Sequence, residues 1–335
     1  FSYQNPMIII MQSWKSIRDL VVEYSSGGEI VQAVNGVDLD LNKGETIGLV
    51  GETGAGKTTI AKAILRILPT PPAKIKSGKV VLDESNLLEL SEQEMQKIRG
   101  NKIAMIFQDP MTALNPTMTV GDQINEVVLQ HNKISREEAE KRTIEMLEMV
   151  GISSLRFHDY PHQFSGGMKQ RVVIAMALAC NPELLLADEP TTALDVTIQA
   201  GIIELMNELR RKYDSSILII THDFGIVADV ADRVGVMYAG NLIEVGEVFE
   251  IFDHPTHPYT RLLMKALPTI TKEEGRLETI RGSVPNLAEE KPGCNFAERC
   301  PYAKEICFRQ KPQLKEISEG HLCACLLLEG GSEDE

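Results

Sequence analysis

The residues best suited to chemistry form a glycine-rich loop, residues 51–58 (GETGAGKT), directly after the apolar run 46–50. The loop fits the G-x-x-x-x-G-K-[ST] phosphate-binding motif at every fixed position, in the strand-then-helix context that the motif requires. Glycines let backbone N–H groups approach a polyphosphate, and the following helix points its positive N-terminus at the anion. Lys57 adds a charge near the β- and γ-phosphates, and Thr58 offers a hydroxyl to Mg²⁺. The sequence therefore predicts a nucleoside triphosphate site.

A second group of reactive side chains follows short apolar runs further along the chain. Asp188 and Glu189 end the run 184–187, which places the first carboxylate near a metal and the second near an attacking water. His222 follows the run 217–221 and Gln108 the run 103–107. Each feature alone also occurs as a solvated or structural element, but the ordered set indicates a hydrolase.

A Ser-Gly-Gly turn, residues 165–167, opens a predicted helix that continues to residue 180. Small residues at a helix N-terminus leave backbone N–H groups open to an anion, so this turn is a second candidate phosphate contact.

Composition limits the classes of protein to consider. The chain has 335 residues, 43% of them hydrophobic, and a formal net charge of −14. No apolar run reaches the roughly 18 residues that span a bilayer, and no secretory signal is visible, so we expect action in the cytoplasm. The acidic balance argues against nonspecific DNA binding as the main task, since such proteins cluster Lys and Arg, and it leaves a local basic groove open. We expect no nucleic acid among the partners.

The elements that must position these residues alternate between strands and helices. Apolar patterning predicts strands at 19–22, 37–41, 46–50, 78–82, 103–107, 183–187 and 216–221, helices at 58–68, 119–152, 165–180 and 197–213, and a hairpin through 237–245. This order predicts an α/β fold: a P-loop core with a largely parallel sheet, an antiparallel β edge and a helical insertion at about 109–178. We divide the chain into a nucleotide-binding domain, 1–260, and a Cys-rich C-terminal extension, 261–335.

Five of the six cysteines lie in the C-terminal extension, and Cys180 alone lies in the body of the chain. Five and six residues separate Cys294, Cys300 and Cys307, wider than the two to four residues typical of paired zinc ligands. Disulfides are disfavoured in a reducing cytoplasm, whereas four thiolates can hold an iron–sulfur cluster. A cluster, a zinc ion and free thiols all remain open from the spacing.

The ordered set of motifs over roughly residues 14–250 resembles the ATP-binding-cassette (ABC) ATPases. The resemblance implies that Tyr24 stacks on adenine, that Gln108 senses Mg²⁺ and the partner domain, that Glu189 polarises the hydrolytic water and that His222 holds the γ-phosphate. Two such cassettes face head to tail, so the Ser-Gly-Gly turn of one caps the ATP held by the Lys57 loop of the other.

The resulting site assignment covers four groups of residues. The catalytic residues are Glu189 and His222. The ATP contacts are Tyr24, Gly51, Thr53, Gly54, Ala55, Gly56, Lys57, Thr58, Thr59 and Gln108. The contacts to the partner's ATP are Ser165, Gly166, Gly167, Gln170 and Asp195. The Mg²⁺ ligands are Thr58, Gln108 and Asp188.

Three further stretches resemble the ATPase subunits of bacterial dipeptide and oligopeptide importers: 107–116 (FQDPMTALNP), 257–260 (HPYT) and 299–301 (RCP). The resemblance implies a peripheral motor on the cytoplasmic face of the membrane, coupling ATP hydrolysis to peptide import. Its partners would be a second, different cassette, two permeases and, indirectly, an extracytoplasmic binding protein. The alternatives are a soluble ABC-type ATPase with a structural metal module and an importer for another substrate such as nickel.

The same resemblance extends to the cysteines of the tail. Tails of this subgroup carry a four-cysteine pattern ending in Gly-His-x-x-Ala-Cys, matched at 320–325, which selects Cys325 and leaves Cys323 as an extra. It implies a [4Fe–4S] cluster held by Cys294, Cys300, Cys307 and Cys325, with zinc as the alternative. We expect a structural role for it, and ATP binding that is independent of the tail because the Lys57 loop belongs to a separate core.

Overall fold

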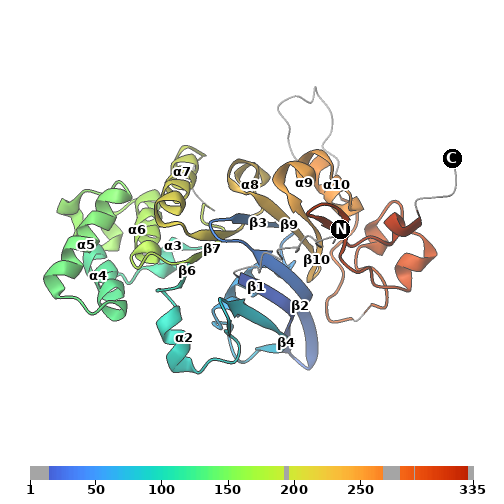
Figure 1. The fold of residues 1–335 in the computed structure, drawn as a ribbon, viewed down its shortest axis with the longest axis horizontal. Helices are drawn as coiled ribbons and strands as arrows, with labels where there is room; N and C mark the ends of the chain where they lie inside the picture. The colour runs from blue at the N-terminus through green and yellow to red at the C-terminus, as the bar shows by residue number, and fades with distance from the viewer. Residues whose placement is uncertain (1–14, 192–195, 267–279, 290, 331–335) are drawn as a thin grey trace, which may run out of the picture.

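The computed structural model describes residues 15–191, 196–266, 280–289 and 291–330. Figure 1 shows an elongated molecule with helices at one end, two sheets in the middle and the C-terminal segments at the other end. The residues of the predicted ATP site lie between these two ends.

The main sheet contains five parallel strands in the order β9 (Arg233–Tyr238), β3 (Thr46–Val50), β8 (Ser216–Ile220), β7 (Leu184–Asp188) and β6 (Ile103–Ile106). Strands β3, β6, β7 and β8 are buried along their whole length, as their uninterrupted apolar runs predict for a sheet covered on both faces. The hairpin of β9 and β10 (Asn241–Glu247) adds an antiparallel edge. The predicted α/β core is confirmed.

A second sheet is antiparallel and more extensive than the sequence indicated. Its order is β2 (Glu29–Leu41), β1 (Lys15–Ser26), β4 (Ala73–Leu82) and β5 (Ser85–Asn86). Its inner face shares one apolar cluster with α1 (Lys57–Ile64), the helix that follows the phosphate loop. Packing against this sheet therefore fixes the start of α1.

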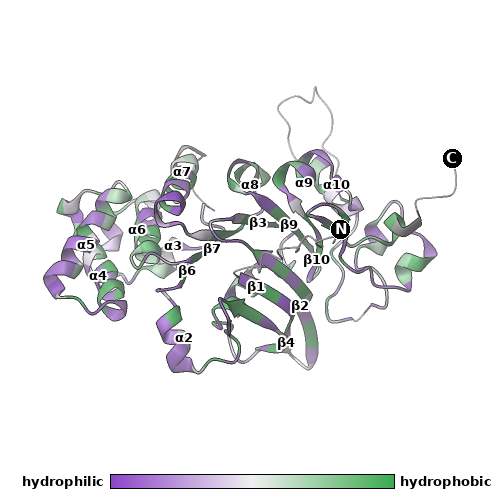
Figure 2. Ribbon diagram, in the orientation of Figure 1, coloured by the Kyte–Doolittle hydropathy of each residue, from purple (hydrophilic) through white to green (hydrophobic). Residues whose placement is uncertain are grey.

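The helical end consists mainly of α4 (Val120–His131), α5 (Arg136–Met149) and α6 (Gly166–Leu178). Thr119 and Ser135 cap the first two helices, and Ser135 forms a capping box with Glu138. Figure 2 shows hydrophilic residues on much of the outer surface of α5, in agreement with its charged sequence. The structure confirms helices within 119–152 but divides them at 132–135.

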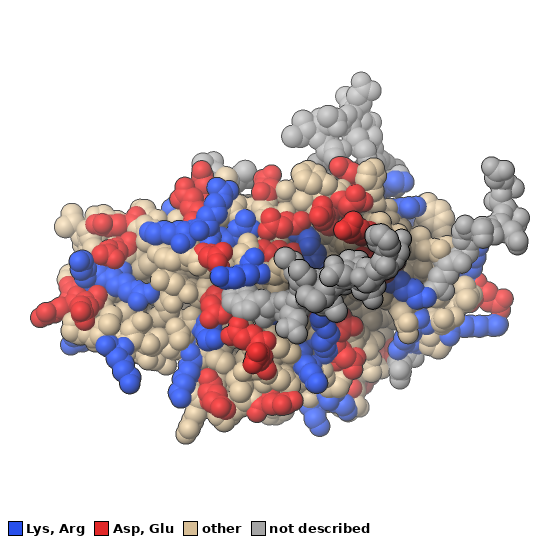
Figure 3. All heavy atoms as spheres, in the orientation of Figure 1, with Lys and Arg blue, Asp and Glu red and all other residues tan. Residues whose placement is uncertain are grey.

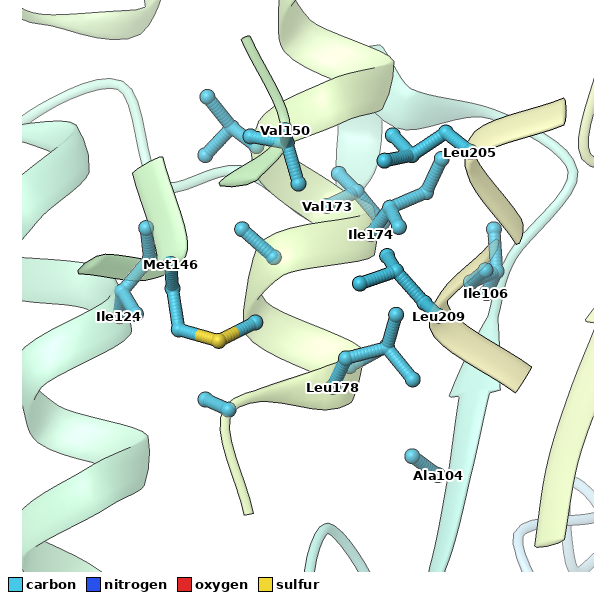
Figure 4. Close-up of a cluster of buried hydrophobic side chains, with 14 of the residues drawn as sticks. Ala104, Ile106, Ile124, Met146, Val150, Val173, Ile174, Leu178, Leu205 and Leu209 are labelled. Carbon is cyan, nitrogen blue, oxygen red and sulfur yellow. The ribbon is translucent and has the colours of Figure 1, made fainter. Parts of the chain in front are cut away.

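Apolar packing joins the helical end to the core through α6. Figure 4 shows side chains from β6, α4, α5 and α7 (Val196–Tyr213) surrounding this helix. The labelled members of the cluster are Ala104, Ile106, Ile124, Met146, Val150, Val173, Ile174, Leu178, Leu205 and Leu209. Helix α6 is consequently buried on several sides from Gly167 on, whereas Ser165 and Gly166 at its N-terminus are exposed.

The remaining helices are α2 (Glu92–Ile98), α3 (Pro110–Ala113), α8 (Phe224–Val230), α9 (Val248–Asp253) and α10 (Pro258–Lys265). The first two flank β6 in the sequence, α8 lies between β8 and β9, and α9 and α10 follow β10.

The C-terminal segment, residues 291–330, is called the Cys module below. Its strand β12 (His321–Cys323) pairs antiparallel with β10, and β11 (Lys315–Ser318) pairs with β12, so the main sheet has eight strands. The ring of Phe296 lies 5.2 Å from that of Tyr238 and 5.4 Å from that of Tyr259. The Cys module thus extends the main sheet of the nucleotide-binding core, so the two expected units share one sheet.

Candidate nucleotide site

A cavity of about 700 Å³ lies where the parallel strands of the main sheet end. The loops after β3, β6, β7 and β8 supply the predicted residues, because the carboxyl ends of parallel strands share one edge of the sheet. The cavity is lined by Val31, Ala33, Gly51, Glu52, Thr53, Gly54, Ala55, Gly56, Lys57, Thr58, Thr59, Gln108, Glu189, His222, Phe224, Leu263 and Leu287. The structure brings the phosphate loop, Gln108, Glu189 and His222 together as predicted.

Two glycines of the phosphate loop have a backbone that other residues could not adopt here. Gly51 has φ +144° and Gly56 has φ +102°. A Cβ atom at position 51 would lie 2.1 Å from the Met237 carbonyl oxygen, and one at position 56 would lie 2.3 Å from that of Ala33. The motif needs glycine at both positions because of the strand backbones beside the loop.

Lys57 is buried within the phosphate loop. Its Nζ donates hydrogen bonds to the carbonyl oxygens of Gly51 (2.6 Å) and Glu52 (3.1 Å). Burial lowers the pKa of Lys57, while the charges of Glu189, Asp188 and Glu52 oppose that shift. The two carbonyl contacts therefore hold the Lys57 amino group inside the phosphate loop, where a phosphate would meet it.

Thr58 and Asp188 form the pair that could hold Mg²⁺. The Thr58 hydroxyl donates to Asp188 Oδ1 at 2.9 Å. Burial raises the pKa of Asp188, and the hydrogen bond from Thr58 opposes the shift. A hydroxyl and a carboxylate side by side are the hard oxygen ligands that Mg²⁺ prefers, so the pair fits the metal.

The carboxylate of Glu189 is held between two predicted partners. Gln108 Nε2 donates to Glu189 Oε2 at 2.8 Å, and His222 Nδ1 lies 3.2 Å from Glu189 Oε1. Glu189 has φ +48°, an uncommon conformation for a residue other than glycine and one often found at functional sites. Its side chain is 18% exposed and that of His222 is 65% exposed. The carboxylate thus faces the cavity, with access for a water molecule.

The Ser-Gly-Gly turn does not reach the phosphate loop of its own chain. The hydroxyl of Ser165 accepts a hydrogen bond from the Met168 N–H at 3.4 Å and so caps α6. In the described part of the chain, residues 165–167 do not line the cavity. Gln170 Nε2 instead donates to the Pro190 carbonyl at 2.6 Å, which links α6 to the segment after Glu189. Asp195 lies outside the described residues.

Tyr24 lies at the margin of the cavity. It is half-buried in β1 against the apolar cluster of the second sheet, and its hydroxyl lies 3.5 Å from the Thr59 hydroxyl. The cavity-lining residues that the structure describes do not include it. Stacking of Tyr24 on adenine stays a prediction.

Sequence reasoning missed Arg299, whose guanidinium contacts the Glu52 carboxylate in the phosphate loop. The two residues are 247 positions apart, so no local motif could indicate the contact. The only signal was the position of Arg299 beside Cys300 in a stretch typical of the importer subgroup.

The four cysteines chosen as cluster ligands influence one another electrostatically. Burial raises the pKa of Cys294 to about 11, and the neighbouring charges of Cys307, Cys325 and Cys300 contribute in the same direction. Burial also raises the pKa of Cys300 and Cys325, each with smaller contributions from other members of the four. No group of three or more His, Cys, Asp or Glu side chains in the described ranges is arranged as a metal site. The iron–sulfur assignment stays a prediction.

Backbone N–H groups favour the thiolate form at three of these cysteines. The N–H of Phe296 hydrogen-bonds the Cys294 sulfur, and that of Tyr302 the Cys300 sulfur, each opposing the effect of burial. The N–H groups of Leu327 and Leu328 do the same at Cys325. Cys323 differs: burial, and then the charge of Glu244, raises its pKa. The surroundings of Cys323 thus differ from those of Cys294, Cys300 and Cys325.

Charged residues are interspersed on the face seen in Figure 3, where Lys and Arg alternate with Asp and Glu. That face presents no continuous basic surface of the kind that nucleic acid requires.

No helix in the described ranges is long and apolar enough to cross a membrane.

Comparison with known proteins identifies two family regions in the chain. Residues 34–192 match the ABC transporter family, and residues 243–307 match the family described as oligopeptide/dipeptide transporter, C-terminal region. The oligopeptide transport ATP-binding protein OppD of Bacillus subtilis is 52% identical over 315 residues, covering 93% of this chain and 88% of OppD. The dipeptide transport ATP-binding protein DppD of the same organism is 49% identical, covering 96% of this chain and 97% of DppD. A solved dimeric ATP-binding cassette in a post-hydrolysis state, bound to ADP and Pi, is 30% identical with a TM-score of 0.63 and covers 70% of this chain and 98% of its own.

Proposed function

Because the chain belongs to the ABC transporter ATPase family, we propose that it is the ATP-hydrolysing subunit of a dipeptide or oligopeptide importer. The observation that carries the proposal is the cavity in which the phosphate loop, Gln108, Glu189 and His222 meet. The matching C-terminal region and two peptide-transport relatives support peptide as the cargo. The soluble-ATPase and nickel-importer alternatives lack such support.

Each residue of the site is assigned a role in ATP hydrolysis. Lys57 and the loop N–H groups bind the β- and γ-phosphates, and Thr58 and Asp188 would hold Mg²⁺, which neutralises phosphate charge when bound. Glu189 orients the attacking water and accepts its proton as the water oxygen bonds to the γ-phosphorus and the bond to ADP breaks. Gln108 and His222 keep the Glu189 carboxylate in place through their 2.8 Å and 3.2 Å contacts.

The functional unit is a dimer of cassettes in which each ATP touches two chains. Support comes from the Ser-Gly-Gly turn, which lies away from its own cavity, and from the dimeric relative of known structure. Ser165, Gly166, Gly167, Gln170 and Asp195 would act on the ATP of the partner. We take the partner to be a second, different cassette, and both to lie under two permeases on the cytoplasmic face of the membrane.

The domain division follows the same proposal. Residues 1–260 form the nucleotide-binding domain, with a helical subdomain at about 109–178, and residues 261–335 form the extension that contains the Cys module. Helix α6 spans the junction between subdomain and core, so movement of the helical end would carry the Ser-Gly-Gly turn with it.

Reconstitution tests the motor assignment. ATP hydrolysis should be slow for the purified chain and rise strongly when the second cassette and permeases are added in lipid, because the isolated site lacks the Ser-Gly-Gly cap. Uptake of a labelled dipeptide into vesicles should require ATP. An isolated chain that hydrolyses ATP as fast as the complex would instead support the soluble ATPase.

The Cys module is proposed to hold a [4Fe–4S] cluster through Cys294, Cys300, Cys307 and Cys325. Support comes from the match of the four cysteines to the tail pattern of the importer subgroup and from backbone N–H groups that hydrogen-bond the sulfurs of Cys294, Cys300 and Cys325. Hydrogen bonds to sulfur are among the features that tune such clusters. The module has few regular elements, so ligation would supply folding free energy that its own packing lacks.

Anaerobic purification tests the cluster. The protein should be brown and contain about four irons per chain. Changing Cys325 to Ser should bleach it, whereas Cys323→Ser, the matched control two residues away, should leave it coloured. Stoichiometric zinc without iron would overturn the cluster while leaving the motor proposal intact.

A further inference from the structure

A buried arginine of the Cys module binds a carboxylate in the phosphate loop. Arg299 Nη1 donates to Glu52 Oε2 at 2.9 Å, and Nη2 donates to Oε1 at 3.1 Å. The Arg299 side chain is 7% exposed and that of Glu52 is 25% exposed. Two parallel hydrogen bonds between a guanidinium and a carboxylate fix both groups in direction as well as distance.

Glu52 in turn connects to the rest of the phosphate loop through its backbone. Its carbonyl oxygen accepts from Lys57 Nζ at 3.1 Å and from the Ala55 N–H at 3.1 Å. Its own N–H donates to the Tyr259 hydroxyl at 3.1 Å. A displacement of Glu52 would therefore reach Lys57, the residue that meets the phosphates.

The guanidinium of Arg299 is held from its other sides as well. Nη1 also donates to the Tyr238 hydroxyl at 3.1 Å, and Nε donates to the Arg281 carbonyl at 3.0 Å. Tyr238 belongs to β9, so the arginine joins the Cys module to the core sheet and the loop together. The bidentate geometry, the burial and these supporting contacts exceed what a surface ion pair shows.

Because Glu52 is negatively charged, its contact with Arg299 should affect nucleotide binding. A carboxylate that lines the phosphate cavity repels a polyphosphate unless a cation balances it. Arg299 supplies that cation from outside the loop. Removing it would leave both a mobile loop residue and an uncompensated negative charge at the site.

We propose that Arg299 is a positioning residue of the ATP site, through which the Cys module orders the phosphate loop by way of Glu52. The inference rests on the proposed ATPase function and gives the C-terminal region a role in nucleotide binding. Arg299 directly precedes Cys300, and the Arg299 N–H donates to the Phe296 carbonyl at 3.0 Å within the same turn. The turn that contains Cys300 thereby positions Arg299, and Arg299 positions Glu52 in the loop that binds ATP.

Thermodynamic reciprocity gives the proposal a second consequence. If the Cys module strengthens ATP binding, ATP must stabilise the Cys module by the same factor. Backbone amides of residues 294–300 should exchange hydrogen more slowly when ATP is bound, although no residue of that segment lines the cavity. Arg299→Ala should abolish this protection.

A double-mutant cycle on the full chain, read out by binding of fluorescent mant-ATP, tests the contact. We expect Arg299→Ala to weaken binding about tenfold or more, since truncating one partner of a desolvated pair leaves the other unpaired. In a Glu52→Ala background the same change should cost less than about twofold, because the contact is already absent. Arg299→Lys should give an intermediate loss, since lysine keeps the charge but not the two-pronged geometry.

The exposed pair of Arg309 and Glu305 in the same module provides the matched control. Arg309→Ala removes an arginine from a similar ion pair far more open to solvent, and it should leave mant-ATP binding unchanged. Circular dichroism and iron content of each variant would show that the module remains folded.

Three results would overturn the assignment. The first is an affinity of Arg299→Ala for mant-ATP equal to that of wild type. The second is a loss of affinity from Arg299→Ala that is as large in the Glu52→Ala background as in wild type. The third is slower amide hydrogen exchange of residues 294–300 with ATP that persists in Arg299→Ala. Wild-type protein that binds no mant-ATP would refute the proposed ATPase function itself, which separates that failure from failure of the Arg299 contact.

Discussion

The two ends of the molecule are attached to the nucleotide site in different ways (Figure 1). The helical end joins the core through one continuous apolar cluster around α6. The Cys module joins it through the pairing of β12 with β10, an aromatic group around Phe296 and buried polar contacts. One of these contacts links His321 Nε2 to Glu244 Oε1 at 2.9 Å, with side chains 3% and 0% exposed.

The difference indicates which site each end can influence. Apolar packing holds α6 against the core, and its Ser-Gly-Gly turn does not line the cavity of its own chain in the described residues. In the proposed dimer that turn would face the partner cassette. The polar contacts of the Cys module reach Glu52 in the phosphate loop of the same chain. The helical end would therefore act on the partner's ATP, and the Cys module on its own.

Replacing Glu189, at the centre of the site, should have the largest effect on ATP hydrolysis. This residue belongs to neither the helical end nor the Cys module. Glu189→Gln keeps the shape and the contact with Gln108 but cannot accept a proton. ATP hydrolysis by the assembled complex should fall by roughly 10² to 10⁴, the usual contribution of a positioned base. Affinity for mant-ATP should be retained, whereas Lys57→Ala should weaken it.

Steady-state phosphate release and mant-ATP titration on the same preparations separate the two outcomes. Wild-type hydrolysis by the Glu189→Gln complex would show that another group accepts the proton.

The core and most of the site could be predicted from the sequence because their signals are local. Strands such as β3 and β7 are short apolar runs. Glu189 and His222 each stand directly after such a run, and Lys57 belongs to the glycine-rich loop that follows β3. Parallel strands bring those ends together without any further information. The Ser-Gly-Gly turn was predictable for the same reason, since it caps a helix.

The contacts of the Cys module could not be predicted because they join distant segments through single side chains. The three residues of β12 are too few for a period-2 pattern, and the pairing with β10 is visible only in the fold. Arg299 and Glu52 carry no motif that links them. For Tyr24 the resemblance predicted stacking on adenine; its hydroxyl lies 3.5 Å from that of Thr59 at the margin of the cavity, and the stacking stays a prediction.

A substitution at the helical end should lower ATP hydrolysis by the assembled complex without changing ATP binding by the isolated chain. A Cβ atom at Gly167 would lie 2.7 Å from Ile198 Cγ2, so Gly167→Ala must shift the start of α6 against α7. We expect hydrolysis by the complex to fall about tenfold, because small misplacements of a catalytic contact are costly. Binding of mant-ATP to the isolated chain should not change.

Gly201→Ala in α7 is the control for this change. Its added Cβ would lie 3.3 Å from the end of the long Arg171 side chain, which can move aside. If Gly167→Ala weakened ATP binding by the isolated chain, the helical end would also act on the ATP site of its own chain. That result would contradict the division of roles between the helical end and the Cys module.

The smallest predicted effect concerns pH and the junction between the core and the Cys module. His257 caps α10 by accepting the Tyr259 N–H at 3.0 Å, its ring lies 5.9 Å from that of Phe296, and burial lowers its pKa to about 3 from 6.5. The unfolded chain therefore binds a proton between pH 6.5 and 3 that the folded chain does not, so stability is full above pH 6.5 and falls as pH decreases. Each pH unit in that window should cost up to about 1.4 kcal/mol of unfolding free energy. In His257→Asn the amide oxygen keeps the cap without titrating, so denaturant unfolding at pH 7 and pH 5.5 should differ less than in wild type. An equal pH dependence in both proteins would show that another group governs the acid sensitivity of this junction.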